Sequence, residues 1–232
     1  MKNKFSLLIV CLFFFFSSIA QEIRFGLGYD QLYAKELDRL IQTYNFTRPF
    51  LDESQPLISN GTQAQLSYIF DTQKKNWSSG VALSHSYNWS SANSTGADVR
   101  FNFNTIKLGY LLHFENDKAM KGLFFDGIIS GNIGLLTKRM NQETFKVDGE
   151  TLQSWHFGGQ VQLNMGYKIA LNRGFHISPY VGIGYAPYMT EGQAEVVINQ
   201  TSTLVDQEYD AMMNWNLGLM FHFIKSSEKR SR

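Results

Sequence analysis

Large apolar residues alternate with small or polar residues along eight segments of the chain. In the clearest segment, residues 155–169, Trp155 and Phe157 alternate with His156 and Gly158. A period of two residues is typical of β-strands whose two faces meet different surroundings. The eight segments are residues 23–29, 63–70, 77–89, 99–114, 125–135, 155–169, 175–185 and 215–223. The pattern therefore predicts an all-β protein with eight strands.

The volume of a small barrel decides which face is inside. A soluble lipocalin-like barrel has the same alternation with an apolar interior, so the period alone leaves both arrangements open. The interior of an eight-stranded barrel is just wide enough to be filled by side chains, with no room for several large apolar residues per strand. We therefore expect the Gly, Ser, Asn and Gln residues to face the lumen and the aromatic residues to face lipid. The four tryptophans are expected to form an interfacial aromatic girdle: Trp77, Trp89, Trp155 and Trp215.

Short and long connections alternate along the chain. The short ones are residues 71–76, 115–122 and 171–174, and the long ones lie near residues 30–62, 90–98, 139–154 and 188–214. This asymmetry is typical of an antiparallel up-and-down transmembrane β-barrel with short periplasmic turns and long extracellular loops. It predicts that both termini are periplasmic. Ten strands remain possible at this stage if the first long connection contains a hairpin.

The beginning of the chain has the form of a secretory signal peptide. Two lysines precede an unbroken apolar run, and Ser18 and Ala20 stand at the positions that a signal peptidase reads. We therefore expect a signal peptide over residues 1–20, an outer-membrane barrel domain over residues 21–224 and a short polar periplasmic tail over residues 225–232.

Composition narrows the chemistry. The formal net charge of +1 argues against a nucleic-acid partner. The only cysteine, Cys11, lies in the expected signal peptide, so we expect neither disulfides nor thiolate chemistry in the mature chain. No metal-ligand spacing and no nucleotide-binding fingerprint occurs, so no metal and no cofactor is expected.

One predicted strand changes phase along its length. Val99 and Phe103 occupy the large-residue positions in its first half, whereas Ile106 and Leu108 occupy them in its second half. A slip of one residue is typical of a β-bulge, which the pattern predicts near residues 104–106.

The long connections are themselves patterned. Apolar residues recur at helical spacing in residues 36–45, which predicts a short amphipathic helix that caps the barrel mouth or lies on the membrane. Strand-like segments at 138–147 and 150–154 flank an Asp-Gly turn, and residues 194–199 face residues 203–213. We hypothesise that the last four barrel strands continue above the membrane as a sheet with a free edge, to which other chains could pair.

Several polar and charged residues fall on the predicted lumen face. They are Arg24, Arg100, Lys107, Asp126, Gln160, Gln162, Asn164, Lys168 and His222. These residues could line an ion pathway, or they could form a plug in which Asp126 neutralises one or two cations. A narrow interior favours the plug, because unpaired buried charge is costly.

Residues 85–88 contain the one cluster that suggests catalysis. The order His-Ser-x-Asn resembles the His-x-Ser-Asn signature of outer-membrane lipid A deacylases, in which a histidine activates a serine. Neighbouring strand residues point to opposite faces, so His85 and Ser86 are expected to point away from each other. A histidine packed at the lipid interface is the alternative interpretation of His85.

The whole pattern resembles the small eight-stranded outer-membrane β-barrel proteins of Gram-negative bacteria that carry no appended domain. Members of that group serve as surface adhesins, structural anchors, partners of larger complexes and occasionally lipid-modifying enzymes. The resemblance implies a non-enzymatic protein of the outer membrane that binds an extracellular or outer-membrane protein partner through its long loops. A narrow channel for small solutes and a lipid A-modifying enzyme are the alternatives. The last strand also resembles the signal that the barrel assembly machinery recognises, through Leu217, Leu219, Phe221 and Phe223.

Overall fold

The computed structural model describes most of the chain after residue 20. The described residues are 21–47, 53–71, 76–94, 97–116, 121–142, 153–191, 194–198, 201–205 and 210–225. The expected signal peptide and all but the first residue of the expected tail lie outside them. Within the described residues, no helix has the length and apolar character needed to cross a membrane.

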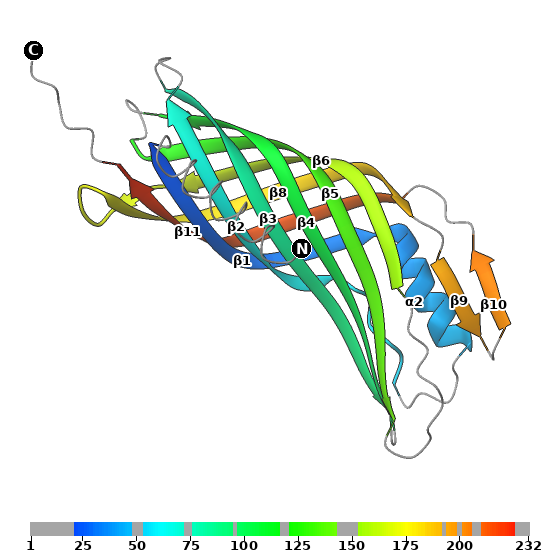
Figure 1. The fold of residues 1–232 in the computed structure, drawn as a ribbon. Coiled ribbons are helices and arrows are strands. Elements are labelled where there is room, and N and C mark those ends of the chain that lie inside the picture. Colours follow the sequence, from blue (N-terminus) through cyan, green and yellow to red (C-terminus); the bar gives the residue numbers. More distant parts are fainter. Residues whose placement is uncertain are drawn as a thin grey trace, which may run out of the picture.

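Eight antiparallel strands close into a barrel (Figure 1). They are β1 (Glu22–Ala34), β2 (Asn60–Asp71), β3 (Trp77–Ser94), β4 (Ala97–Glu115), β5 (Leu123–Gln142), β6 (Gln153–Tyr167), β8 (Phe175–Glu191) and β11 (Asp210–Ile224). Each strand pairs with the next in the chain, and β11 pairs with both β8 and β1, which closes the sheet. The predicted eight-stranded up-and-down barrel is therefore confirmed. The short β7 (Ile169–Ala170) pairs with β8 at one end of the barrel.

The strands are strongly tilted. Cross-strand partners followed once around the barrel from Glu22 lead back to β1 at Leu32, ten residues further along. Such a register offset accompanies the tilt of closed barrels, which Figure 1 shows. Because of this offset, side chains at very different positions along their strands meet at one height in the lumen.

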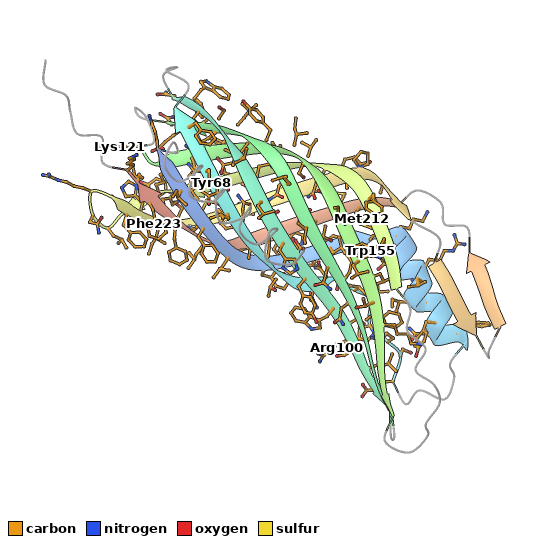
Figure 2. All side chains as sticks on the ribbon, in the orientation of Figure 1. Tyr68, Arg100, Lys121, Trp155, Met212 and Phe223 are labelled. Carbon is orange, nitrogen blue, oxygen red and sulfur yellow. The ribbon has the colours of Figure 1, made fainter. Side chains whose placement is uncertain are left out.

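The two faces of the wall have the predicted polarity over most of the barrel. Large apolar side chains point outward and are exposed, among them Leu27, Leu83, Leu108, Ile129, Leu163, Ile183 and Leu217. Their neighbours along each strand point inward and are mostly polar and buried. Figure 2 shows the outward side chains around the wall, with Trp155 and Phe223 labelled.

Strand β4 corrects two predictions. It pairs with β3 and β5 in unbroken register from Ala97 to Glu115, so the bulge predicted near residues 104–106 is wrong. Phe101 and Phe103 are buried inside, whereas Arg100 is exposed on the outer face, so its predicted place in the lumen is also wrong (Figure 2). The phase of the strand stays constant, but the surroundings change. From Val99 to Phe103 the inner face packs against a helix and the outer face carries polar residues, whereas after Ile106 the outer face is apolar.

Within the described residues, the register shifts of the barrel lie in β8. Its registers with both neighbouring strands shift by one residue between Tyr185 and Met189. Pro187 falls in this interval and has no N–H to donate to a neighbouring strand. Bulges are among the few places inside sheets that accept proline, so Pro187 explains where the ladder slips.

Three strands extend beyond the others. β3 and β4 pair out to Ser94 and Ala97, and β5 follows β4 to Gln142, whereas β2 and β6 stop short of this height. We call residues 90–94, 97–102 and 138–142 the extension. The sheet above the barrel was predicted from the last four strands. Of these, β5 does continue above the barrel, but it pairs there with β4, so that β3 and β4 supply the rest of the sheet. The predicted strand pairing after residue 194 is confirmed in part, because residues 194–198 pair with residues 201–205. β9 (Ala194–Ile198) and β10 (Thr201–Val205) form a separate two-stranded sheet, and the predicted Asp148-Gly149 turn lies outside the described residues.

The predicted helix forms in the first long connection. It is α2 (Lys35–Thr47), which follows β1 directly and contacts β1 and β11. Its apolar face is spaced at three and four residues, and Leu37 and Ile41 on that face are buried. Figure 1 shows the helix at the end of the barrel opposite to the start of β1.

Candidate functional site

Seven ionisable side chains meet inside the barrel at the end where β1 begins and β11 ends. We call them the ion cluster: Glu22, Arg24, His113, Glu115, Asp126, Lys168 and His222. They come from β1, β4, β5 and β11 and from the residue between β6 and β7. The tilt of the strands brings them to one height, and together they fill this part of the lumen.

Arg24 is the centre of the ion cluster. Its Nε donates to Glu22 Oε1 at 2.5 Å, and its Nη1 donates to both carboxylate oxygens of Asp126 at 3.2 and 3.1 Å. The guanidinium also lies 5.1 Å above the centre of the Phe124 ring. Arginine is suited to this place because its planar, weakly hydrated charge can be shared between two carboxylates and an aromatic face.

Lys168 closes the same end of the lumen. Its Nζ donates to Glu22 Oε2 at 3.1 Å and to Glu115 Oε2 at 2.5 Å. Glu22 therefore bridges the two cations. The three carboxylates and two cations of the ion cluster leave little unpaired charge, which is the arrangement of a plug.

Ser178, His222 and Glu22 form a hydrogen-bonded chain. His222 Nδ1 lies 2.6 Å from Glu22 Oε1, and His222 Nε2 lies 2.7 Å from Ser178 Oγ. A carboxylate only accepts, so His222 donates from Nδ1 and Ser178 donates to Nε2. The order matches the relay that activates a serine nucleophile, but the exposed fraction of Ser178 is 0%. The chain therefore fixes the orientation of His222 instead of offering a hydroxyl to a substrate.

A second polar group surrounds Asp30 near the other end of the lumen. Asn214 Nδ2 donates to Asp30 Oδ1 at 2.7 Å, and Asn88 Nδ2 donates to Asp30 Oδ2 at 3.3 Å. Gln160 and Asn132 continue this network at 2.7 and 3.1 Å. These side chains line a cavity of about 20 Å³, which we call the polar pocket. Lys107 and Ser86 also line it.

Two glycines of β8 make room for the lumen side chains. A Cβ at Gly184 would lie 2.0 Å from Gln160 Nε2 and 2.3 Å from Asn214 Oδ1. A Cβ at Gly182 would lie 2.1 and 2.5 Å from the side-chain oxygens of Asn164 and Asn216. The Gly-x-Gly spacing thus follows from the bulk of the amides on the neighbouring strands.

Above the polar pocket, an apolar cluster seals the barrel mouth. Leu37 and Ile41 of α2 are 4% and 0% exposed, and they pack with inward side chains of five strands. The ring of Tyr44 meets that of Phe101 edge-on at 5.2 Å, and Lys138 Nζ lies 4.6 Å from the centre of the Tyr44 ring. We call α2 with residues 53–59 the cap. Partial burial raises the pKa of the Asp38 carboxyl on α2.

Side-chain hydrogen bonds hold the return segment of the cap. Asn45 Nδ2 donates to the carbonyl oxygen of Gln55 at 2.9 Å, and Gln55 N donates to Asn45 Oδ1 at 2.8 Å. Gln55 Nε2 donates to Ser90 Oγ at 2.6 Å, and Ser90 donates to the carbonyl oxygen of Pro56. The cap is therefore tied to β3 of the extension and is not a loose loop.

The structure separates the sequence-predicted site residues into three groups. Eight of the expected lumen residues are buried inside: Arg24, Lys107, Asp126, Gln160, Gln162, Asn164, Lys168 and His222. The four tryptophans Trp77, Trp89, Trp155 and Trp215 are exposed on the outer face. His85 is exposed outside and Ser86 is buried inside, so the wall separates these two catalytic candidates.

Sequence reasoning missed several members of the lumen network. Glu22, Asp30 and Glu115 lie just beyond the predicted strand ends. Each continues the alternation of its strand, and Asp30 follows Gly26 and Gly28 at the same spacing, so extending the strands would have found them. Ser178 was expected to face the lumen, but nothing in the sequence pointed to its partner 44 residues away. Among the described residues, no cluster of three or more His, Cys, Asp or Glu is arranged to hold a metal ion.

The family model described as the autotransporter beta-domain matches residues 58–227. The match begins at Ile58, just before β2, and runs through β11, so it leaves out β1 and α2. No curated protein matches the chain.

Solved structures of outer-membrane proteins are similar to the chain over most of its length. Ail, the attachment invasion locus protein of Yersinia pestis, in complex with the heparin analogue sucrose octasulfate, has 15% identity, with 87% of this chain and 98% of that chain covered and a TM-score of 0.48. Neisserial surface protein A has 8% identity, with 88% of this chain and 96% of that chain covered and a TM-score of 0.41. The outer membrane protease OmpT from Escherichia coli has 8% identity, with 89% of this chain and 97% of that chain covered and a TM-score of 0.46. None of these similarities bears on function.

Proposed function

The chain belongs to the autotransporter beta-domain family, and from this premise we propose that its barrel is a closed, non-enzymatic scaffold that binds a partner through its extracellular side. The protein is an outer-membrane β-barrel, because the family and the closed antiparallel sheet agree on this. The exposed apolar belt of the wall therefore contacts membrane lipid. The nature of the partner and the side on which it binds belong to the proposal.

The observation that carries the proposal is that the lumen is closed at two heights. The ion cluster crosses it at one end, where Arg24 of β1 is bonded to Asp126 of β5. The apolar cluster under the cap fills it at the other end, where Ile41 is fully buried. A solute would have to break charged hydrogen bonds and displace a packed helix, which weighs against a passive channel.

The cap end carries the features that suit recognition. Here the extension projects beyond the lipid-facing belt, and hydrogen bonds that join Gln55 and Pro56 to Ser90 hold the cap against it. Recognition by loops on a rigid scaffold is common, because the scaffold lowers the entropy lost on binding. We propose that this end is extracellular and that both termini are periplasmic. The connections at the other end are short, which supports that orientation.

An enzyme of the lipid A deacylase kind has less support. Its histidine must reach its serine, yet His85 faces outward and Ser86 faces the lumen. The other serine–histidine pair, Ser178 with His222, is buried in the ion cluster.

The first test of the proposal uses single cysteines on intact cells. Ser91→Cys in the extension is matched by Lys121→Cys in the turn before β5, since both residues are exposed. We expect a membrane-impermeant maleimide to label the first variant and not the second until the outer membrane is opened. Labelling at position 121 alone would overturn the orientation.

The second test addresses closure and binding. Purified protein in planar bilayers is expected to show no steady conductance, whereas a stable open pore would overturn the closed scaffold. A photo-crosslinking amino acid at position 91 is then expected to form a discrete adduct on intact cells, with position 121 as the matched control. Equal adducts at both positions, or none at 91, would contradict partner binding at the cap end.

A further inference from the structure

The middle of the lumen is lined by polar atoms that other protein atoms do not satisfy. Among the described residues, eight buried side-chain atoms in this region have no hydrogen-bond partner in the protein. They are Gln63 Nε2 and Oε1, Gln65 Oε1, Ser86 Oγ, Asn164 Nδ2, Tyr180 Oη, and Asn216 Nδ2 and Oδ1. We call these six residues the polar belt. They come from β2, β3, β6, β8 and β11, so they surround the lumen.

The polar belt lies between the ion cluster and the polar pocket. Asn164 is the register partner of Asp126, which belongs to the ion cluster. Asn216 is the register partner of Asp30, which belongs to the polar pocket. Ser86 is common to the belt and the lining of the pocket, and it is the register partner of Gln63. The unpartnered atoms therefore form one connected region instead of scattered defects.

Two glycines let the strands and the Tyr180 side chain approach each other closely in this region. Gly28 and Gly218 are opposite each other on β1 and β11, and neither places a side chain in the lumen. The Tyr180 hydroxyl reaches across β11 towards β1, where a Cβ at Gly28 would lie 3.1 Å away. Leu32 and Phe103 of the apolar cluster line the polar pocket on the side of the cap.

Lys107 supplies the strongest requirement for a ligand. It is 6% exposed, it lines the polar pocket, and it takes part in none of the ion pairs found among the described residues. Asp30, whose charge acts on Lys107, already accepts hydrogen bonds from Asn88 and Asn214. A buried ammonium with three donors needs acceptors between it and Asp30.

We propose that the polar belt and the polar pocket form a closed chamber that binds water, and that bound water bridges Lys107 to Asp30. The pocket of about 20 Å³ is sufficient for a water molecule, which needs roughly 10–15 Å³ by the same measure. Water fits the belt because it can both donate to Gln63 Oε1 and Asn216 Oδ1 and accept from Ser86 and Tyr180. A chloride ion would only accept, and it would lie near the Asp30 carboxylate.

The test is an NMR measurement of contacts between water and side-chain amides, on the isotope-labelled full barrel in lipid nanodiscs. The amide groups of Gln63 and Asn216 are expected to show direct cross-peaks to water with the sign of a long-lived bound molecule. The backbone amides of β3 are controls in the same barrel wall, because they pair with the neighbouring strands β2 and β4. Their cross-peaks are expected to be several-fold weaker. Absent cross-peaks at both Gln63 and Asn216 would overturn the chamber.

A second measurement separates water from an anion. Replacing chloride by gluconate at constant ionic strength is expected to leave the Lys107 and Ser86 resonances unchanged, and a chloride-dependent shift would overturn water as the bridging ligand. In Lys107→Met, water contacts at Gln63 are expected to persist, while those at Ser86 weaken. If this variant does not fold, the wild-type cross-peaks and the chloride titration still decide the proposal.

Discussion

Arg24 and Asp126 are 102 residues apart in the chain, yet Arg24 Nη1 lies 3.2 and 3.1 Å from the two carboxylate oxygens of Asp126 inside the barrel. The pair joins β1 to β5, which are not neighbours in the sheet, so it ties one side of the wall to the other. Both side chains are buried, and both are also held by other members of the ion cluster.

Neutralising Asp126 should destabilise the barrel strongly. Asp126→Asn keeps the shape but leaves Arg24 with less compensating charge, and removing one partner of a buried pair costs about 3–5 kcal/mol. We expect a lower urea midpoint for unfolding in detergent micelles, read from the electrophoretic shift between folded and unfolded barrel. Glu53→Gln, at an exposed position, is the control and should leave the midpoint unchanged. Equal midpoints for both variants would contradict a structural role for the ion cluster.

A methyl group at Gly184 should disturb the polar pocket. Its Cβ would lie 2.0 Å from Gln160 Nε2, closer than any normal contact. Overpacking of this kind costs about 1–3 kcal/mol. Gly131→Ala is a matched control on β5, because nothing lies within 4 Å of a Cβ built there. We expect a lower unfolding midpoint for the first variant only, and the reverse order would contradict the described packing of the lumen.

Truncating Ile41 should loosen the cap without opening the ion cluster. Ile41→Ala removes a fully buried side chain from the apolar cluster, for which the typical loss is about 2–5 kcal/mol. Hydrogen exchange of the α2 amides is expected to become faster, while exchange in β1 near Arg24 stays slow. Gln42→Ala changes the adjacent exposed residue and should have little effect. Slow exchange in α2 of the Ile41 variant would show that the cap does not depend on this contact.

Arg100 and Lys107 should respond differently to loss of charge, although both lie on β4. Arg100 is exposed, so Arg100→Gln should change the free energy of unfolding by less than about 0.5 kcal/mol. Lys107 is buried in the polar pocket, so Lys107→Gln should change it by more. Urea titrations that measure the free energy of unfolding of the two variants test whether the inward and outward faces of β4 alternate without a bulge. Equal, large changes in the free energy of unfolding for the two variants would indicate that Arg100 lies in the lumen.

Substitution of His85 or Ser86 should leave the composition of lipid A the same as in cells that express the wild-type protein. The two side chains lie on opposite faces of β3, so neither can activate the other. Mass spectra of lipid A from cells that express wild type, His85→Ala or Ser86→Ala are expected to be identical. A difference between wild type and either variant would revive the enzymatic alternative.

The period of two in the sequence was sufficient to predict the strands, the direction of most side chains and the closed barrel. This succeeds because a strand's faces alternate strictly, and because an eight-stranded interior has no room for aromatic residues from every strand. A helix was predicted over residues 36–45 for the same kind of reason, since Leu37 and Ile41 recur at helical spacing, and the structure has it over residues 35–47. Local periodicity therefore predicted the fold and most of the side chains that point outward.

Only the tertiary structure decided what lies inside. The partners of Arg24 and Lys168 depend on the ten-residue register offset around the barrel, which no local pattern encodes. The reversed polarity of β4 looked like a bulge because the sequence does not reveal that α2 folds back over Phe101 and Phe103. The sequence by itself determined that Arg100 and Phe101 lie on opposite faces, whereas the position of the helix decided which of them is buried.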